Sequence, residues 1–124
     1  MAEPEQVVRE FCAAWSDLDR DHLMAFFAPD AVYHNMPVDP VVGTDAIRAF
    51  VESFTASVDH VSFEILHSAA AGPVVLTERV DTFVAGDRSI GLPVMGTFEV
   101  HDGKITAWRD YFDMAQAMTA VGMG

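Results

Sequence analysis

Two aspartates and one arginine stand in strand-like segments whose alternation gathers their side chains with aromatic residues. In the last such segment, Trp108, Asp110 and Phe112 share one face. A carboxylate between two large aromatic side chains is expected to point inward, where it needs a partner because burial of an unpaired charge is costly. The alternatives are an exposed edge position for Asp110 or a bond from it to a backbone group.

A second segment offers that partner. On one of its faces, alternation places Arg79 beside Asp81, roughly 7 Å apart, among Val75, Thr77 and Phe83. Carboxylates held together in a dry site are suited to proton transfer. Parity alone slightly favours the simpler alternative, a solvated Arg79–Asp81 pair of little energetic weight.

Other motifs for chemistry give little support. Tyr33 and Asn35 share a face of a short strand, but alone they are also typical of an ordinary strand end. The five histidines lack metal-ligand spacing such as H-E-x-x-H, so neither a metal nor a cofactor is expected. A nucleophile elbow, a phosphate-binding loop and a dinucleotide fingerprint are all missing from the sequence.

Helical spacing dominates the first half of the chain. The first predicted helix begins near Pro4, carries the apolar stripe of Val7, Val8, Phe11, Cys12, Trp15 and Leu18, and stops near residues 16–19. The pattern then predicts a short helix capped by Asp19 or Asp21 that carries Leu23, Met24, Phe26 and Phe27 and ends at Pro29. A strand over 31–35, a proline-rich loop over 36–42, and a helix with Thr44 as N-cap and Ile47, Phe50, Val51 and Phe54 on its apolar face follow.

The second half is β-rich. Strands are predicted over 60–71, 73–84, 89–101 and 104–113, and a last helix over 114–121. Short turns make consecutive strands antiparallel, and Pro93 predicts a bulge or an edge position. Helices must then pack on one face of a curved sheet, which predicts a single α+β domain over 1–124 whose half-open barrel encloses a pocket.

Composition excludes several classes of partner. The 124 residues carry a net charge of −12, which repels nucleic acid and anionic membrane surfaces, while 51% hydrophobic residues suffice for a core. The sequence shows no signal-peptide pattern and no apolar run of ~20 residues, and Cys12 is its only cysteine. We therefore expect a cytoplasmic protein without disulfides.

Three blocks together resemble the limonene-1,2-epoxide hydrolase family. They are Tyr33-His34-Asn35-Met36-Pro37, Thr77-Glu78-Arg79-Val80-Asp81, and Gly103-Lys104-Ile105-Thr106 with Trp108-Arg109-Asp110-Tyr111-Phe112-Asp113, in the family's order and at similar spacing. The resemblance covers nearly the whole chain. It implies the cystatin-like α+β cone of the larger nuclear transport factor 2-like or SnoaL-like superfamily, in which a curved mixed or antiparallel sheet packs against three to four helices around a deep apolar pocket.

The resemblance also implies the roles of five residues. Asp110 matches the base that activates water, Asp81 the acid that protonates the epoxide oxygen, and Arg79 the bridge between them, while Tyr33 and Asn35 match the residues that hold the water. Physical chemistry agrees, since one cation, two carboxylates and one shared proton sum to zero charge. The implied reaction is one-step hydrolysis of an epoxide to a vicinal diol, without a covalent intermediate or a cofactor.

The remaining pocket candidates are apolar: Trp15, Phe54, Phe83, Leu92, Val94 and Phe112. As a set they favour a lipophilic cyclic, terpene-like or aryl epoxide. The resemblance implies a homodimer, and the sheet face that carries Arg109 and Tyr111 is a candidate interface. Two alternatives stay open, a ketosteroid-isomerase-like or polyketide-cyclase-like enzyme with Asp110 as base, and a non-catalytic dimeric module that binds apolar ligands.

Overall fold

The computed structural model describes residues 3–120, and its first two elements are helical. Helix α1 (Pro4–Ala14) begins with proline in its first turn and continues into the 3-10 helix η1 (Trp15–Asp17), where Leu18 takes a left-handed φ of 50°. Most of its predicted apolar stripe is buried, namely Val7, Val8, Phe11, Cys12 and Trp15, whereas Leu18 follows the helix and is half-buried. The helical segment ends at Asp17, which confirms the predicted stop at 16–19.

The short helix α2 (Arg20–Met24) ends earlier than predicted. Asp19 is its N-cap and accepts a hydrogen bond from the backbone N–H of His22 at 3.1 Å. Strand β1 (Phe27–Asn35) begins at Phe27, so the assignment of Phe26 and Phe27 to this helix is wrong. Phe27 pairs with Ile105, and a register shift follows between Phe27 and Val32. Pro29 lies in this irregular stretch, so its missing N–H removes no hydrogen bond from a regular ladder.

The loop and the third helix also differ from prediction at their ends. Val41 and Val42, predicted as loop, form the two-residue strand β2 (Val41–Val42) against β1. Helix α3 (Thr44–Thr55) has Gly43, with φ 91°, as its N-cap, so the assignment of Thr44 is wrong. The Thr44 hydroxyl donates instead to the Ala28 carbonyl at 3.1 Å, which ties the helix to β1.

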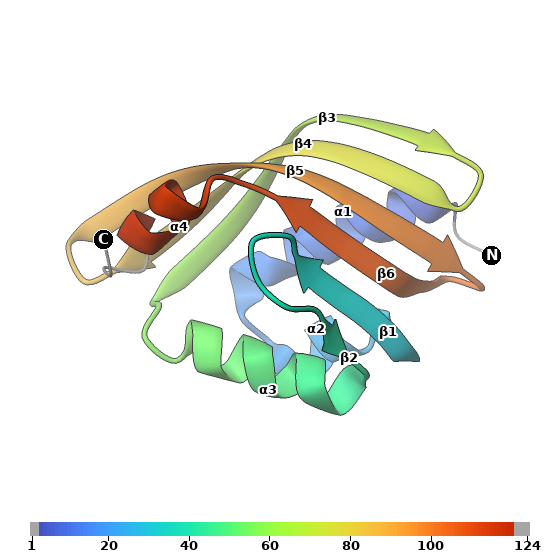
Figure 1. Cartoon of the computed structure of the whole chain (residues 1–124), viewed down its shortest axis with the longest axis horizontal. Coiled ribbons are helices and arrows are strands. Elements are labelled where there is room, and N and C mark those ends of the chain that lie inside the picture. Colours follow the sequence, from blue (N-terminus) through green and yellow to red (C-terminus); the bar gives the residue numbers. More distant parts are fainter. Residues whose placement is uncertain (1–2, 121–124) are drawn as a thin grey trace.

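The rest of the sheet is the predicted antiparallel meander. It consists of β3 (His60–Ala71), β4 (Val74–Ala85), β5 (Arg88–His101) and β6 (Lys104–Tyr111), so the last strand ends two residues before the predicted boundary at residue 113. The strand order is β2-β1-β6-β5-β4-β3, with β1 parallel to β6. The sheet arches over α1, α2 and α3, which lie together on its concave side (Figure 1). This is the predicted α+β class with a curved mixed sheet.

Two further predictions concern β5 and the last helix. Pairing of β5 with β6 covers only Met95 onward, so Pro93 faces a neighbour in β4 alone, and its predicted edge position is confirmed. Helix α4 (Met114–Ala120) packs against β5, and Val121, its predicted end, lies outside the described residues. Within residues 3–120, no helix is long and apolar enough to cross a membrane.

Candidate active site

The pairing of β1 with β6 brings two distant segments together. In this parallel register, Tyr33 lies opposite Trp108 and Asn35 lies opposite Asp110. Trp108 and Asp110 both point to the concave side and are 0% and 4% exposed. The alternative of an exposed edge position for Asp110 is therefore wrong.

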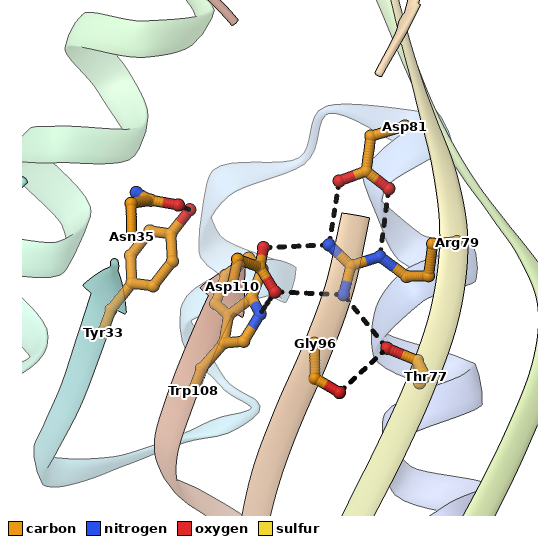
Figure 2. Close-up of polar contacts among 8 residues, drawn as sticks. All are labelled: Tyr33, Asn35, Thr77, Arg79, Asp81, Gly96, Trp108 and Asp110. Carbon is orange, nitrogen blue, oxygen red and sulfur yellow. Dashed lines mark hydrogen bonds and ion pairs between the residues drawn. The ribbon is translucent and has the colours of Figure 1, made fainter. Parts of the chain in front are cut away.

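Arg79 lies between the two aspartates in the middle of the sheet (Figure 2). Its Nε and Nη2 donate to the two oxygens of Asp81 at 3.0 and 2.8 Å. Its Nη1 and Nη2 donate to the two oxygens of Asp110 at 3.2 and 2.8 Å. Arg79 is 1% exposed and Asp81 3%, so the solvated ion pair that parity slightly favoured is wrong. One guanidinium thus holds two carboxylates by bidentate bonds.

Two residues that sequence reasoning did not assign support this guanidinium. The Thr77 hydroxyl accepts from Arg79 Nη1 at 3.2 Å and donates to the carbonyl of Gly96 at 3.3 Å. A Cβ on Gly96 would come within 2.4 Å of Arg79 Nη1 and 2.7 Å of Asp110 Oδ1. Gly96 therefore provides the space in which the guanidinium lies. The signal for it was a glycine inside a predicted strand, which often marks a close approach.

The cluster carries one positive charge and two acidic groups. Burial raises the pKa of Asp81 to about 6, although the hydrogen bonds and charge of Arg79 oppose the rise. Burial alone would lower the pKa of Arg79, but the charges and hydrogen bonds of Asp110 and Asp81 outweigh it and raise that pKa above its ordinary value. Arg79 therefore stays charged, and Asp81 can exchange a proton near neutral pH.

Tyr33 and Asn35 form a second polar pair beside Asp110, on the side away from Arg79 (Figure 2). The Tyr33 hydroxyl donates to the Asn35 side-chain oxygen at 3.2 Å. Burial raises the pKa of Tyr33 well above its ordinary value, so its hydroxyl stays protonated. This bond leaves a lone pair of the Tyr33 oxygen and the Asn35 amide N–H groups for another small polar molecule.

These polar groups open onto an apolar pocket of about 220 Å³. Four of its lining residues are polar, namely Tyr33, Asn35, Asp81 and Asp110. All six residues predicted to contact substrate also line it: Trp15, Phe54, Phe83, Leu92, Val94 and Phe112. Ten of the eleven predicted residues therefore line one cavity. The eleventh, Arg79, lies directly behind the two aspartates.

Sequence reasoning missed the other part of the pocket wall. The additional lining residues are Val38, Phe50, Val51, Phe63, Met114, Ala117 and Met118. Phe50 and Val51 were predicted on the apolar stripe of their helix, but without a place in the pocket. The i, i+3, i+4 spacing of the three α4 residues was a usable signal. Phe63 supports the site directly, since the Arg79 guanidinium carbon lies 4.9 Å from its ring centroid.

Neither the histidines nor Cys12 contribute to this site. Among the described residues, no group of three or more His, Cys, Asp or Glu side chains is arranged to hold a metal ion. Burial raises the pKa of the Cys12 thiol to about 12, so it is not a thiolate nucleophile at neutral pH. The titratable side chains that line the pocket are Tyr33, Asp81 and Asp110.

The sequence and the fold of this chain are similar to those of known epoxide hydrolases. A family model described as the limonene-1,2-epoxide hydrolase catalytic domain matches residues 2–122. Epoxide hydrolase EphG of Mycobacterium tuberculosis is 36% identical over 109 residues, which span 86% of this chain and 71% of that protein. The solved structure of an LEH-like epoxide hydrolase from M. tuberculosis has a TM-score of 0.84 at 31% identity and covers 98% of this chain and 90% of that one. An NTF2-like protein of unknown function from Burkholderia pseudomallei, at 20% identity with 98% of each chain covered and a TM-score of 0.84, shares the fold alone.

Proposed function

Since the chain belongs to the limonene-1,2-epoxide hydrolase family and is an epoxide hydrolase, we propose that it adds water to a lipophilic epoxide in one step. The product is a vicinal diol, and no covalent intermediate forms. The observation that carries this proposal is the buried Asp81–Arg79–Asp110 cluster, which opens onto an apolar pocket. Its two carboxylates supply the acid and the base that epoxide opening requires.

Asp110 is the proposed base. A water molecule between Asp110 and the Tyr33–Asn35 pair would donate one proton to the carboxylate and accept a hydrogen bond from the Asn35 amide. The Tyr33 oxygen, which donates its own proton to Asn35, is left to accept the second water proton. These contacts orient the water and contribute mainly to alignment.

Asp81 is the proposed acid. Its pKa of about 6 allows a protonated fraction near neutral pH, and it lines the same pocket as Asp110. As the C–O bond of the epoxide breaks, Asp81 gives its proton to the developing alkoxide, while Asp110 takes one from the attacking water. Arg79 bonds to both residues, so the cluster of one cation, two carboxylates and one shared proton has zero net charge before and after the transfer.

The pocket supports a substrate with little polarity beyond the epoxide itself. Its aromatic residues include the T-shaped pair of Phe54 and Phe83, with ring centroids 5.3 Å apart. The bonds of Arg79 to both carboxylates favour hydrolysis, which uses an acid and a base together, over the isomerase alternative, which uses Asp110 alone. We therefore place cyclic, terpene-like and aryl epoxides in the proposed substrate class.

A single-turnover reaction in oxygen-18 water tests the mechanism. With enzyme in excess, we expect the diol to contain one oxygen-18 atom from the first turnover. Unlabelled oxygen transferred from the protein would show a carboxylate nucleophile and contradict direct attack by water. D110N and D81N should each lose most activity, whereas D102N, a matched change in the exposed β5–β6 turn, should keep it.

We further propose a homodimer formed by the convex face of the sheet. Leu76, Met95 and Tyr111 are on this face and are 45%, 51% and 46% exposed. Met95 and Tyr111 pair across β5 and β6, so they form a continuous apolar surface. Analytical ultracentrifugation should show twice the mass of one chain, and M95E should shift the equilibrium towards monomer. A monomeric wild-type protein at micromolar concentration would contradict this proposal.

A further inference from the structure

The indole of Trp108 makes a direct contact with the proposed base. Its Nε1 donates to Asp110 Oδ1 at 2.7 Å, and Trp108 is fully buried. In the described part of the chain, Trp108 is not one of the residues that line the pocket. Its contact with the site is therefore through Asp110 and not through the substrate pocket.

The hydrogen bonds of Asp110 divide unequally between its two oxygens. Oδ1 accepts from Trp108 Nε1 at 2.7 Å and from Arg79 Nη1 at 3.2 Å, so both of its lone pairs are used. Oδ2 accepts only from Arg79 Nη2, at 2.8 Å, among the contacts of the described residues. One lone pair of Oδ2 thus remains for a proton, and the Trp108 bond determines which oxygen has it.

The same indole also positions the residues that are proposed to hold the water. The Tyr33 ring stacks on Trp108 with centroids 4.0 Å apart and an interplanar angle of 9°. The Tyr33 hydroxyl in turn bonds to Asn35. Figure 2 shows the indole of Trp108 next to the Asp110 carboxylate, with Tyr33 and Asn35 on the side opposite to Arg79.

Core packing alone does not account for this N–H. Trp15 belongs to the same aromatic cluster, 6.1 Å from Trp108 between ring centroids, and is 3% exposed. Its Nε1 has no hydrogen-bond partner among the described residues. A buried indole in this cluster is therefore compatible with the fold without a carboxylate on its nitrogen, and the bond from Trp108 to Asp110 is a separate feature.

We propose that Trp108 is a positioning residue for the hydrolysis, which fixes the base and the water-holding Tyr33 on one rigid ring and leaves Asp110 Oδ2 as the proton-accepting atom. This role rests on the proposed function of Asp110 as base. It adds a sixth residue to the site, one that touches neither water nor substrate.

The contact is tested first without any turnover. The chain has two tryptophans, so a nitrogen-15 NMR spectrum shows two indole N–H signals, and the one that remains in W15F belongs to Trp108. We expect the Trp108 signal at low field, as for a hydrogen bond to a carboxylate, and we expect it to move in D110N. The Trp15 signal should not move. A Trp108 signal unchanged by D110N would overturn the proposal, whether or not any epoxide is hydrolysed.

The catalytic role is tested by removal of the N–H alone. Incorporation of 3-benzothienylalanine at position 108 replaces N–H by sulfur and keeps the ring shape, so it avoids the cavity of W108F. We expect kcat to fall at least tenfold with KM within threefold. The acid limb of the pH–rate profile should move to higher pH, because the ionised carboxylate loses a hydrogen-bond donor. The same substitution at Trp15, which lines the pocket, is a control for the acid limb alone, and that limb should stay in place. A variant at 108 with kcat within threefold of wild type and an unshifted limb would overturn the proposal.

Discussion

Replacement of Gly96 by alanine should disable the site while the strand keeps its fold. The added Cβ would lie 2.4 Å from Arg79 Nη1, whereas ordinary contacts begin at 3.4 Å, so the guanidinium has to withdraw by about 1 Å. The guanidinium end of an arginine usually moves at little cost in free energy. Arg79 differs because it is held by hydrogen bonds to two carboxylates and by the Phe63 ring, so its displacement must stretch those bonds.

The magnitude follows from this displacement. The same Cβ would lie 2.7 Å from Asp110 Oδ1, so the proposed base is displaced together with the guanidinium. A misplacement of about 1 Å in a catalytic group can lower the rate about 100-fold. This corresponds to about 2.7 kcal/mol of lost transition-state stabilisation. We expect the fall in kcat/KM to come mainly from kcat, because the apolar pocket wall is unchanged.

G91A is the matched control. Gly91 lies in the same strand but is exposed, and its added Cβ would meet a Val80 methyl at 3.2 Å, which a small side-chain shift relieves. Steady-state kinetics on a cyclic epoxide measures kcat/KM of both variants, and circular dichroism checks that both are folded. The reasoning is refuted if folded G96A retains kcat/KM within threefold of wild type.

Four other predictions concern the same site. Because protonated Asp81 is the proposed acid and its pKa is raised to about 6, kcat/KM should fall about tenfold per pH unit above pH 6; a flat profile from pH 6 to 9 would argue against this role. The raised pKa also means that the folded state binds this proton more tightly than the unfolded chain does. Denaturant titrations should therefore show stability falling between about pH 4 and 6 and D81N lacking this part of the fall. T77V removes one of the two acceptors of Arg79 Nη1 at constant shape and should lower kcat about tenfold, and an unchanged kcat would show that the hydroxyl is dispensable. F83A enlarges the pocket and should raise kcat/KM for bulky epoxides relative to small ones in a competition assay, whereas equal losses for both would place Phe83 outside the substrate contacts.

The part of the site that could best be predicted from sequence is the set of side chains that share one face of a strand. Because the period of a strand is two, Trp108 with Asp110 and Arg79 with Asp81 had to share a face once the strands were predicted. The burial of Arg79 could not be predicted in the same way, since both faces of β4 carry apolar residues. It depends on which face of β4 the sheet turns to its concave side.

The missed features depend on pairings between distant segments. Phe26 and Phe27 fit a helical stripe as well as a strand, and only the pairing of Phe27 with Ile105 decides for the strand. The role of Gly96 likewise requires the register of three strands, in which it lies between Thr77 and Asp110. A sequence pattern marks such a glycine as unusual but does not identify the side chain that lies over it.

The parallel pairing of β1 with β6 has a consequence for the order in which the protein gains activity. Strands β3, β4 and β5 are joined by short hairpins and can form from local contacts, which close faster than distant ones. At that stage Arg79 and Asp81 are already neighbours, but the base, its indole and the partner of β1 all arrive with β6. On the proposed mechanism, a nascent chain on the ribosome cannot hydrolyse an epoxide until β6, which carries Asp110, has emerged and inserted between β1 and β5. Hydrolysis then reports completed folding more strictly than secondary structure does.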